Sequence, residues 1–374
     1  MKKKLLLVGI GGYAFTYLNP LLNNEYTDCV IVGCVDPYPE ACPNIDKIRE
    51  LNIPLYSDME DFFNEGNKAD LCVISSPIQF HSKQIKTALK YGANVLCEKP
   101  LCGDVNDVDD LLKTEKESGK YVGIGYQWSH SDAIQKLKKD ILGGAYGNPK
   151  LLKTIVLWPR NKDYFKRSSG WAGKLRAKDG TPILDSVANN ATAHYLHNIF
   201  YVLGDDVDLS KEPKTVNAEL FRANDIENYD TCKVDMTFEN GAKALYIASH
   251  ATDAVCEPMF EYYFENGKVV YNQNENDGNI IGYFSDAKTV TYGNPFDGPL
   301  NKLDLALKAV ENPETKAVCG IKTASVHTKI ISKIQEFEIN EFPTDKFKTT
   351  ADDSAIYIEG LYDELMNCYE TAEA

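Results

Sequence analysis

The chain has 374 residues, of which 43% are hydrophobic and 25% are charged, a composition typical of a soluble folded protein of about two domains. Its 40 Lys and Arg against 55 Asp and Glu give a net charge of −15, which argues against nucleic acid and anionic membranes as partners. No apolar run approaches the roughly 18 residues of a membrane helix. The ten cysteines are scattered without a CxxC pair, which predicts reduced thiols, no structural metal and a cytoplasmic location.

Short apolar runs alternate with helical patterns over the first 125 residues. Helices are expected over Ser82–Tyr91, ended by Gly92, and over a second run that closes near Gly119. Strand, helix and strand repeated in this way predict a doubly wound parallel sheet in a domain of residues 1–125. The expected strands are Lys4–Val8, Cys29–Val35, Leu71–Ser75, Asn94–Cys97 and Tyr121–Gly125.

The pattern changes after Tyr126, where longer polar loops separate stretches of alternating residues. These stretches predict an α/β domain of residues 126–374 with an open, mostly antiparallel sheet. Helices are expected over Thr323–Phe337 and at the tail, Asp353–Tyr369. The expected strands lie in Lys233–Glu239, Lys243–Ser249, Phe260–Tyr271 and Lys288–Tyr292.

A glycine-rich turn, Gly9-Ile10-Gly11-Gly12-Tyr13-Ala14, follows the first expected strand and fits G-x-G-x-x-A. Gly9 permits the tight turn, Gly11 lets the backbone approach a pyrophosphate, and Ala14 lets the next helix lie close to the strand. Asp36 ends the second strand, where a carboxylate accepts ribose hydroxyls and repels a 2′-phosphate, which favours NAD over NADP. The cofactor-binding candidates here are Gly9, Gly11, Gly12, Tyr13, Ala14 and Asp36.

Two further turns fall at the carboxyl ends of expected parallel strands, the edge where open α/β sheets bind ligands. One is Ser75-Ser76-Pro77, followed by His81, and the other is Glu98-Lys99-Pro100. Lys99 is expected to point its charge across the nicotinamide toward a substrate hydroxyl, lowering the hydroxyl pKa and stabilising an alkoxide. All six of these residues, Ser75, Ser76, Pro77, His81, Glu98 and Lys99, are cofactor-binding candidates, and Lys99 is also a catalytic candidate.

Two of the six histidines lie in the segment Asp185–His197. Oxidation of a secondary alcohol needs a base for the hydroxyl proton, and an imidazole suits that role at neutral pH. His194 is therefore the candidate base. Asn189, Asn190 and His197 beside it are candidate substrate contacts.

All three tryptophans lie within 44 residues, and two of them fall in the locally basic stretch Lys153–Lys178. Aromatic faces stack on sugar rings, and Arg160, Lys166, Arg167 or Lys174 could bind a carboxylate or the hydroxyls of a glycoside. The alternative is a solvated loop whose aromatic residues anchor it to the core or to a neighbouring subunit. The substrate-binding candidates are Trp128, Trp158, Arg160, Tyr164 and Trp171.

Taken together, Gly9-x-Gly11-x-x-Ala14, Asp36, Glu98-Lys99-Pro100, Gly125-Tyr126-Gln127 and a C-terminal helix with Thr323–His327 resemble the Gfo/Idh/MocA oxidoreductases. This family includes glucose-fructose oxidoreductases and inositol dehydrogenases. The resemblance implies an N-terminal Rossmann domain for NAD, with Gln127 at the cofactor and Lys99 in the catalytic lysine position. It also implies a homodimer or homotetramer formed through a large C-terminal sheet, and hydride transfer on a sugar, polyol or related hydroxyl compound.

The second catalytic motif of that family, Asp-x-x-x-His with a Gly about ten residues after the His, is altered here. Counting back ten residues from Gly204 gives His194 as the family histidine. Asn190 then stands at the Asp position if no gap is allowed, whereas Asp185 matches if five residues are inserted. Asp185 is the favoured third catalytic residue, and the choice between it and Asn190 stays open.

Three functions are compatible with these residues. The first is an NAD-dependent dehydrogenase acting on a ring hydroxyl. The second is redox-neutral glycoside cleavage, in which transient oxidation acidifies a neighbouring proton, the aglycone is eliminated and the hydride is restored. The third is a non-catalytic nicotinamide-binding protein.

Overall fold

The computed structural model describes residues 2–166 and 170–373, and these residues form two compact units. The first unit runs to Tyr126 and also includes Pro299–Ser325. The second unit comprises Gln127–Gly298 and the chain from Val326 onward. No helix in the described ranges is both long enough and apolar enough to cross a lipid bilayer.

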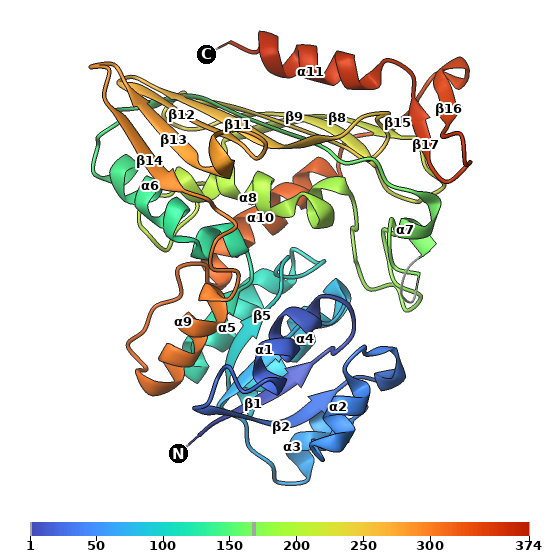
Figure 1. The fold of residues 1–374 in the computed structure, drawn as a ribbon, viewed down its shortest axis with the longest axis vertical. Coiled ribbons are helices and arrows are strands. Elements are labelled where there is room, and N and C mark those ends of the chain that lie inside the picture. Colours follow the sequence, from blue (N-terminus) through green and yellow to red (C-terminus); the bar gives the residue numbers. More distant parts are fainter. Residues whose placement is uncertain (1, 167–169, 374) are drawn as a thin grey trace. The chain divides into compact units, whose positions relative to one another are not determined.

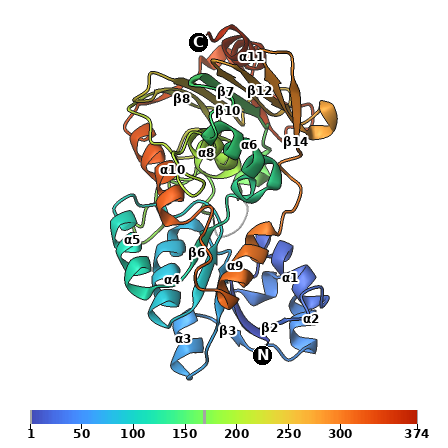
Figure 2. The same ribbon diagram turned by 90° about the vertical axis from the view of Figure 1, so that its left-hand side faces the viewer.

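The first unit contains a six-stranded parallel sheet with the strand order β3-β2-β1-β4-β5-β6. Figure 2 shows helices on both sides of this sheet. Its strands read as continuous apolar runs because helices cover both faces of the sheet. The five expected strands are confirmed, and the two-residue β3 was too short to give a sequence signal. The strands are β1 (Lys3–Val8), β2 (Cys29–Val35), β3 (Leu55–Tyr56), β4 (Leu71–Ile74), β5 (Asn94–Cys97) and β6 (Val122–Ile124).

Helices pack on the two faces of this parallel sheet. Gly92 and Gly119, at φ 77° and 63°, follow α4 and α5 in the left-handed conformation that ends a helix readily at glycine. One face carries α1 (Phe15–Leu22), α2 (Ile45–Glu50) and α9 (Asn301–Glu311), and the other carries α3 (Met59–Asn64), α4 (Ile78–Lys90) and α5 (Asp107–Ser118).

Helix α9 returns to the first unit from a distant part of the sequence. Its residues Leu303, Ala306 and Leu307 are buried in the same apolar cluster as Leu18 of α1. The sequence patterns of the first 125 residues do not predict this helix, because it lies after Gln127–Gly298 of the second unit in the sequence.

The second unit is built on a nine-stranded sheet with the order β14-β13-β12-β11-β7-β10-β9-β8-β15 (Figure 1). Neighbouring strands are antiparallel except for β7 with β10 and β8 with β15, so the expected mostly antiparallel open sheet is confirmed. The strands are β7 (Pro149–Leu157), β8 (Thr215–Arg222), β9 (Thr231–Thr237), β10 (Lys243–Ser249), β11 (Cys256–Phe264), β12 (Gly267–Asn272), β13 (Ile280–Phe284), β14 (Thr289–Gly293) and β15 (Ile339–Glu341).

The two faces of the nine-stranded sheet are covered differently. Helices α6 (Asp132–Leu142), α8 (Ala193–Val202) and α10 (Ile321–Ile334) lie along one face, and α11 (Leu361–Thr371) lies along the other (Figure 1). Lys153 of β7 is buried beneath α11, where its Nζ donates to the backbone oxygen of Tyr369 at 3.0 Å and pairs with Glu261 at 3.1 Å. The bond to Tyr369 helps to hold the C-terminal helix on the sheet.

The expectation of one tail helix over Asp353–Tyr369 was wrong in its first half. Strand β17 (Ile356–Ile358) pairs there with β16 (Phe347–Thr349). Helix α11 begins only after Gly360, whose φ of 80° is left-handed and does not fit a right-handed helix. The first-half pattern was ambiguous because three apolar residues suit a short strand as well as a helix.

Candidate active site

The first unit places two loops side by side where its strand order reverses. Strands β1 and β4 are neighbours in the sheet, and the chain continues from β1 to β2 on one side and from β4 to β5 on the other. The crevice at such a reversal is where sheets of this kind bind ligands. Gly9 follows β1, and Ser75 and Ser76 follow β4. The Ser75 backbone N–H still donates to the Val8 oxygen at 2.7 Å, so the two loops start from a fixed base.

The glycine loop is shaped by close contact on one side and open space on the other. Gly9 has a φ of 76°, and a Cβ there would lie 2.6 Å from the backbone nitrogen of Ser76. Gly11 and Gly12 differ, because a Cβ on either would meet no atom of the described residues within 4 Å. Ala14 is buried where the backbone turns into α1. The loop therefore presents bare backbone to the side where a pyrophosphate would approach.

Asp36 ties the second strand to this loop. Its Oδ2 accepts the Ile10 backbone N–H at 3.0 Å, and its Oδ1 accepts the Tyr38 N–H at 2.8 Å. A carboxylate has about four acceptor positions, so two remain for ribose hydroxyls. Nearby, the buried Ser75 hydroxyl has no hydrogen-bond partner among the described residues. The open loop, the half-used carboxylate and this orphaned hydroxyl all fit a bound dinucleotide.

The Glu98-Lys99-Pro100 turn follows β5 and separates its two charged side chains. Glu98 is buried, whereas Lys99 is only partly buried. Burial alone would raise the pKa of Glu98, but the charge of Lys302 and hydrogen bonds from Lys302 and Tyr17 outweigh it and hold the pKa below its ordinary value. The Lys99 N–H also donates to Glu98 Oε2 at 3.3 Å. The buried Glu98 carboxylate thus holds the turn in place, whereas the Lys99 side chain lies nearer the surface.

Lys302, on α9, is a residue of this site that sequence reasoning missed. Its side chain is 1% exposed, and its Nζ lies 3.3 Å from the Tyr13 hydroxyl and 4.8 Å from the centre of the Tyr13 ring. It therefore joins Glu98 to the glycine loop. The available signal was its helical register with Ala306 and Ala309, which places a lysine in a buried apolar stripe.

His81 links the turns that follow β4 and β5. It lies within α4 and is 1% exposed, with Nδ1 at 2.8 Å from the Pro100 oxygen and Nε2 at 2.8 Å from the Ser76 oxygen. Burial lowers its pKa below the ordinary value, despite the raising effect of these two carbonyls. Pro77 precedes the first turn of α4. The imidazole thus contacts the backbone of both loops.

In the second unit, the segment that carries the candidates Asp185, Asn189, Asn190 and His194 forms a π-helical turn, Val187–Ala191, that leads into α8. Asp185 is buried, and its Oδ2 accepts the Gly173 N–H at 2.6 Å. Asn189 is also buried and donates to the oxygens of Ile183 and Leu184 at 3.3 and 3.0 Å. Asn190 and His194 remain partly exposed. Of these residues, Asn190 and His194 are the more accessible to a ligand.

Two predicted substrate contacts lie in the core of the second unit. His197 is 1% exposed and stacks on Tyr201, and burial, with the charges of His327, Lys138 and His130, holds its pKa well below the ordinary value. Trp128 is 2% exposed and packs edge-on against Tyr195, with ring centroids 4.8 Å apart. Gln127 precedes it in the 3-10 turn Gln127–His130.

The remaining aromatic candidates lie beyond β7. Trp158 and Tyr164 flank Arg160, whose Cζ is 5.4 Å and 4.8 Å from the two ring centres. Trp171 is partly buried, whereas Arg167 lies outside the described residues. Tyr164 belongs to the short helix α7 (Lys162–Lys166).

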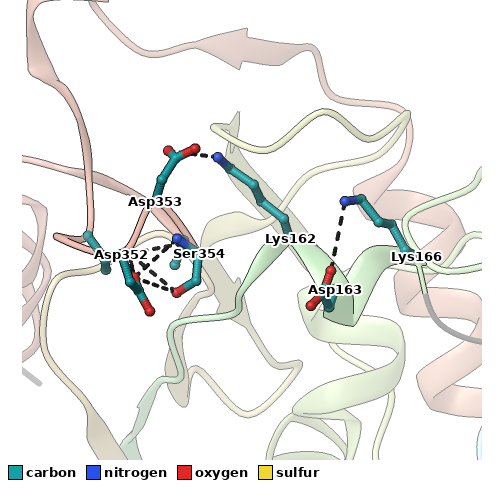
Figure 3. Close-up of polar contacts among 8 residues, drawn as sticks. Lys162, Asp163, Lys166, Asp352, Asp353 and Ser354 are labelled. Carbon is teal, nitrogen blue, oxygen red and sulfur yellow. Dashed lines mark hydrogen bonds and ion pairs between the residues drawn. The ribbon is translucent and has the colours of Figure 1, made fainter.

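Helix α7 is fastened to a loop near the C-terminus. Lys162 Nζ pairs with Asp353 at 2.9 Å, and the Lys162 N–H donates to the Ser354 oxygen at 2.8 Å (Figure 3). Asp352 holds that loop together through Thr350 and Ser354, and these hydrogen bonds lower its pKa to about 2. The segment that follows Arg160 is thus anchored to the rest of the unit.

Two family models match the chain. Residues 3–126 match the oxidoreductase family with an NAD-binding Rossmann fold, and residues 134–270 match the GFO/IDH/MocA C-terminal domain. Curated relatives include an uncharacterized oxidoreductase, YrbE, of Bacillus subtilis, 26% identical over 50% of this chain and 51% of that protein. A myo-inositol 2-dehydrogenase of Thermotoga maritima is 23% identical over 60% of this chain and 64% of its own. The chain thus spans about half to two thirds of the length of these relatives.

Among solved structures, the fold is similar to that of the WlbA dehydrogenase from Bordetella pertussis in complex with NADH and UDP-GlcNAcA. The TM-score is 0.70 and the sequences are 20% identical, over 90% of this chain and 96% of the other. This likeness establishes the architecture of both units.

Proposed function

Because the chain belongs to the Gfo/Idh/MocA oxidoreductase family, with its NAD-binding Rossmann fold, we propose that it transfers a hydride between NAD and a ring hydroxyl of a sugar, polyol or glycoside. The observation that carries the proposal is the bare glycine loop at the β1–β4 crevice, with Lys99 at the end of β5 in the same unit. The names of the inositol dehydrogenase and the WlbA dehydrogenase support a carbohydrate-like substrate. When bound, the nicotinamide supplies the hydride acceptor.

The residues of the first unit would bind the cofactor and set its orientation. Backbone N–H groups at Gly11 and Gly12 suit the pyrophosphate, and Asp36 suits the adenosine ribose while disfavouring NADP. Ser75, Ser76 and Gln127 are the proposed contacts nearer the nicotinamide. Glu98 and His81 would not contact the cofactor in this arrangement. Their role would be to hold the backbone of the loops in place.

The proposed proton chemistry uses Lys99 and His194. The ammonium of Lys99 lowers the pKa of the substrate hydroxyl and stabilises the alkoxide that develops as the hydride leaves. The imidazole of His194 accepts the hydroxyl proton. Asp185 or Asn190 would orient that imidazole, and the contact between Asp185 and Gly173 gives Asp185 a second task in holding the neighbouring loop.

Incubation of the purified protein with NAD and a panel of sugars, sugar acids and aryl glycosides tests the proposal. Absorbance of NADH and release of aglycone are followed together. The proposal predicts stoichiometric NADH with one sugar, lost in Lys99→Ala and kept in Lys113→Ala, which removes an exposed lysine of α5. Aglycone release without NADH would instead establish redox-neutral cleavage, and NAD binding without either product would leave a non-catalytic binding protein.

The expected homo-oligomer remains a proposal with a restriction. Helix α11 packs over β7 and β10, so assembly through the sheet would have to use the part of that face beyond this helix. Light scattering of the protein as it elutes from a size-exclusion column measures its mass. We expect the mass of a dimer or tetramer, and the mass of a monomer would contradict the proposal.

A further inference from the structure

Backbone hydrogen bonds fix the main chain of Arg160, which lies just beyond the end of the central strand β7. The Trp158 N–H donates to the Ser249 oxygen at 2.9 Å, and the Arg160 N–H donates to the His250 oxygen at 3.1 Å. His250 Nδ1 lies 2.8 Å from the Trp158 oxygen. The strand pairing between β7 and β10 therefore continues through Arg160, and the base of its side chain is held in place.

The guanidinium of Arg160 is also held, by contacts with two aromatic rings. It lies between the rings of Trp158 and Tyr164, an arrangement that stabilises a cation without consuming its N–H groups. Its Nε is buried and has no hydrogen-bond partner among the described residues. No carboxylate in the described ranges lies within 4.0 Å of this guanidinium. The charge of Arg160 is therefore not paired with a carboxylate of these ranges and can attract an anionic ligand.

Two hollows open on either side of this side chain, and Pro159 and Arg160 form part of the wall of both. One is completed by Asn161, Tyr164 and Ala355. The other is completed by Trp158, Val255 and Glu257, and there the Trp158 Nε1 donates to Glu257 Oε2 at 2.8 Å. The second hollow therefore offers a cation on one wall and an anchored carboxylate on another.

One wall of this hollow contacts the residue that follows the candidate base in the sequence. The Trp158 ring packs edge-on against Tyr195, with centroids 5.6 Å apart, and Tyr195 directly follows His194 on α8. Burial raises the pKa of Tyr195 well above its ordinary value, the charge of Glu257 raises it further, and Arg160 lowers it. Both charges of the hollow thus act at the residue next to His194.

We propose, as an extension that rests on the proposed function, that Arg160 binds an anionic substituent of the sugar substrate, a carboxylate or a phosphate. A guanidinium also presents paired N–H groups along the edge formed by its two Nη atoms, away from the buried Nε, and this edge matches the paired oxygens of either group. Glu257 would accept sugar hydroxyls across the same hollow. Since the chain carries a net charge of −15, anionic sugars need such a local cation to be selected.

Intrinsic tryptophan fluorescence in the Lys99→Ala background, with NAD at saturation, measures sugar binding without turnover, and NADH formation is followed separately in the protein that keeps Lys99. Glucose, glucuronate and glucose 6-phosphate are compared, with the galacto and manno series as further matched sets. We expect one anionic member of a set to bind about tenfold or more tightly than its neutral counterpart, as two charge-assisted hydrogen bonds predict. The preference should fall as salt is added.

Three variants assign the preference to Arg160. Arg160→Met keeps an apolar stem between the two rings and should abolish the preference, whereas Arg160→Lys keeps the charge but loses the paired edge and should retain only part of it. Arg176→Met, in the same basic stretch but exposed, should leave it unchanged. Melting curves of each variant verify that the fold is kept.

The outcomes separate this inference from the proposed function. Equal binding of neutral and anionic members in every set, or a preference that survives Arg160→Met, overturns the anion site even if NADH forms. Binding of an anionic sugar that depends on Arg160, without any NADH, keeps the anion site and overturns the proposed oxidation. Phosphate preferred over carboxylate, or the reverse, identifies which anion the site takes.

Discussion

Lys302 and Glu98 form an ion pair in the interior of the first unit although 204 residues separate them in the sequence. The pair connects α9 to the turn that carries Lys99. Glu98 Oε1 also accepts a hydrogen bond from Tyr17, and Lys302 reaches the hydroxyl of Tyr13. Two buried charges thus brace both the turn that carries Lys99 and the glycine loop.

Removal of one partner of this pair should be far more costly than removal of both. Lys302→Met leaves the Glu98 carboxylate buried without its cation, and we expect a loss of about 3–5 kcal/mol in the free energy of unfolding. The double variant Glu98→Gln/Lys302→Met should recover much of that loss. Urea denaturation measures both, and Lys308→Met, which changes an exposed lysine of the same helix, is the control. A double variant no more stable than Lys302→Met would refute the coupling.

Alanine substitutions at two glycines of the loop should distinguish an effect on stability from an effect on cofactor binding. Gly11 has a φ of −83°, and a Cβ there meets no atom of the described residues, so Gly11→Ala should fold with unchanged stability. Its methyl group would project into the space assigned to the pyrophosphate, and NAD affinity should fall by about tenfold or more. Gly9→Ala, in contrast, should lose both stability and NAD binding, because of its φ and its contact with Ser76. Calorimetric titration and melting curves check both, and unchanged NAD affinity in Gly11→Ala would contradict the placement.

Asp36 should set the choice between NAD and NADP. Asp36→Ala removes the carboxylate that repels a 2′-phosphate, so the ratio of NAD to NADP affinity should fall. Absolute affinity for NAD should fall as well, because Asp36 also holds the Ile10 N–H of the glycine loop. Titration with both dinucleotides gives the ratio. An unchanged ratio would show that another residue discriminates between them.

The carboxyl of Glu115 on α5 should make stability depend on pH. Burial raises its pKa from 4.5 to about 7, so the folded state holds this proton more tightly than the unfolded chain does. Its contribution is fully present below pH 4.5 and is lost as the pH rises through 7. Glu115→Gln should therefore match the original protein in acid and exceed it in stability above pH 7. Urea titrations at the two extremes test this, and an equal difference at both would contradict it.

Much of the fold follows from local patterns. Strands β2, β5 and β10 coincide with their expected limits, because β2 and β5 are short apolar runs ended by a charged residue and β10 is a stretch of alternating residues. The glycine turn and the Glu98-Lys99-Pro100 turn fall at strand ends for the same reason. These features depend on residues that are neighbours in the sequence, and sequence reasoning reaches them directly.

The features that were missed depend on contacts between distant residues. Nothing near Glu98 indicates that Lys302 will neutralise it, and nothing near Asp185 indicates its bond to Gly173. Ring stacking was expected of Trp128, but the sequence does not reveal that Tyr195 and Phe296 enclose it. Arg160 was one of several cations in a basic stretch, and only the structure shows that its Nε is buried and unused.

Isotope transfer tests the central claim most directly. A sugar deuterated at its ring carbons is incubated with NAD and the protein, and the nicotinamide is analysed by mass spectrometry. Hydride transfer predicts one deuterium on the reduced nicotinamide with the original protein and none with Lys99→Ala. Oxidised sugar accompanied by unlabelled NADH, or label released only to water, would contradict the account.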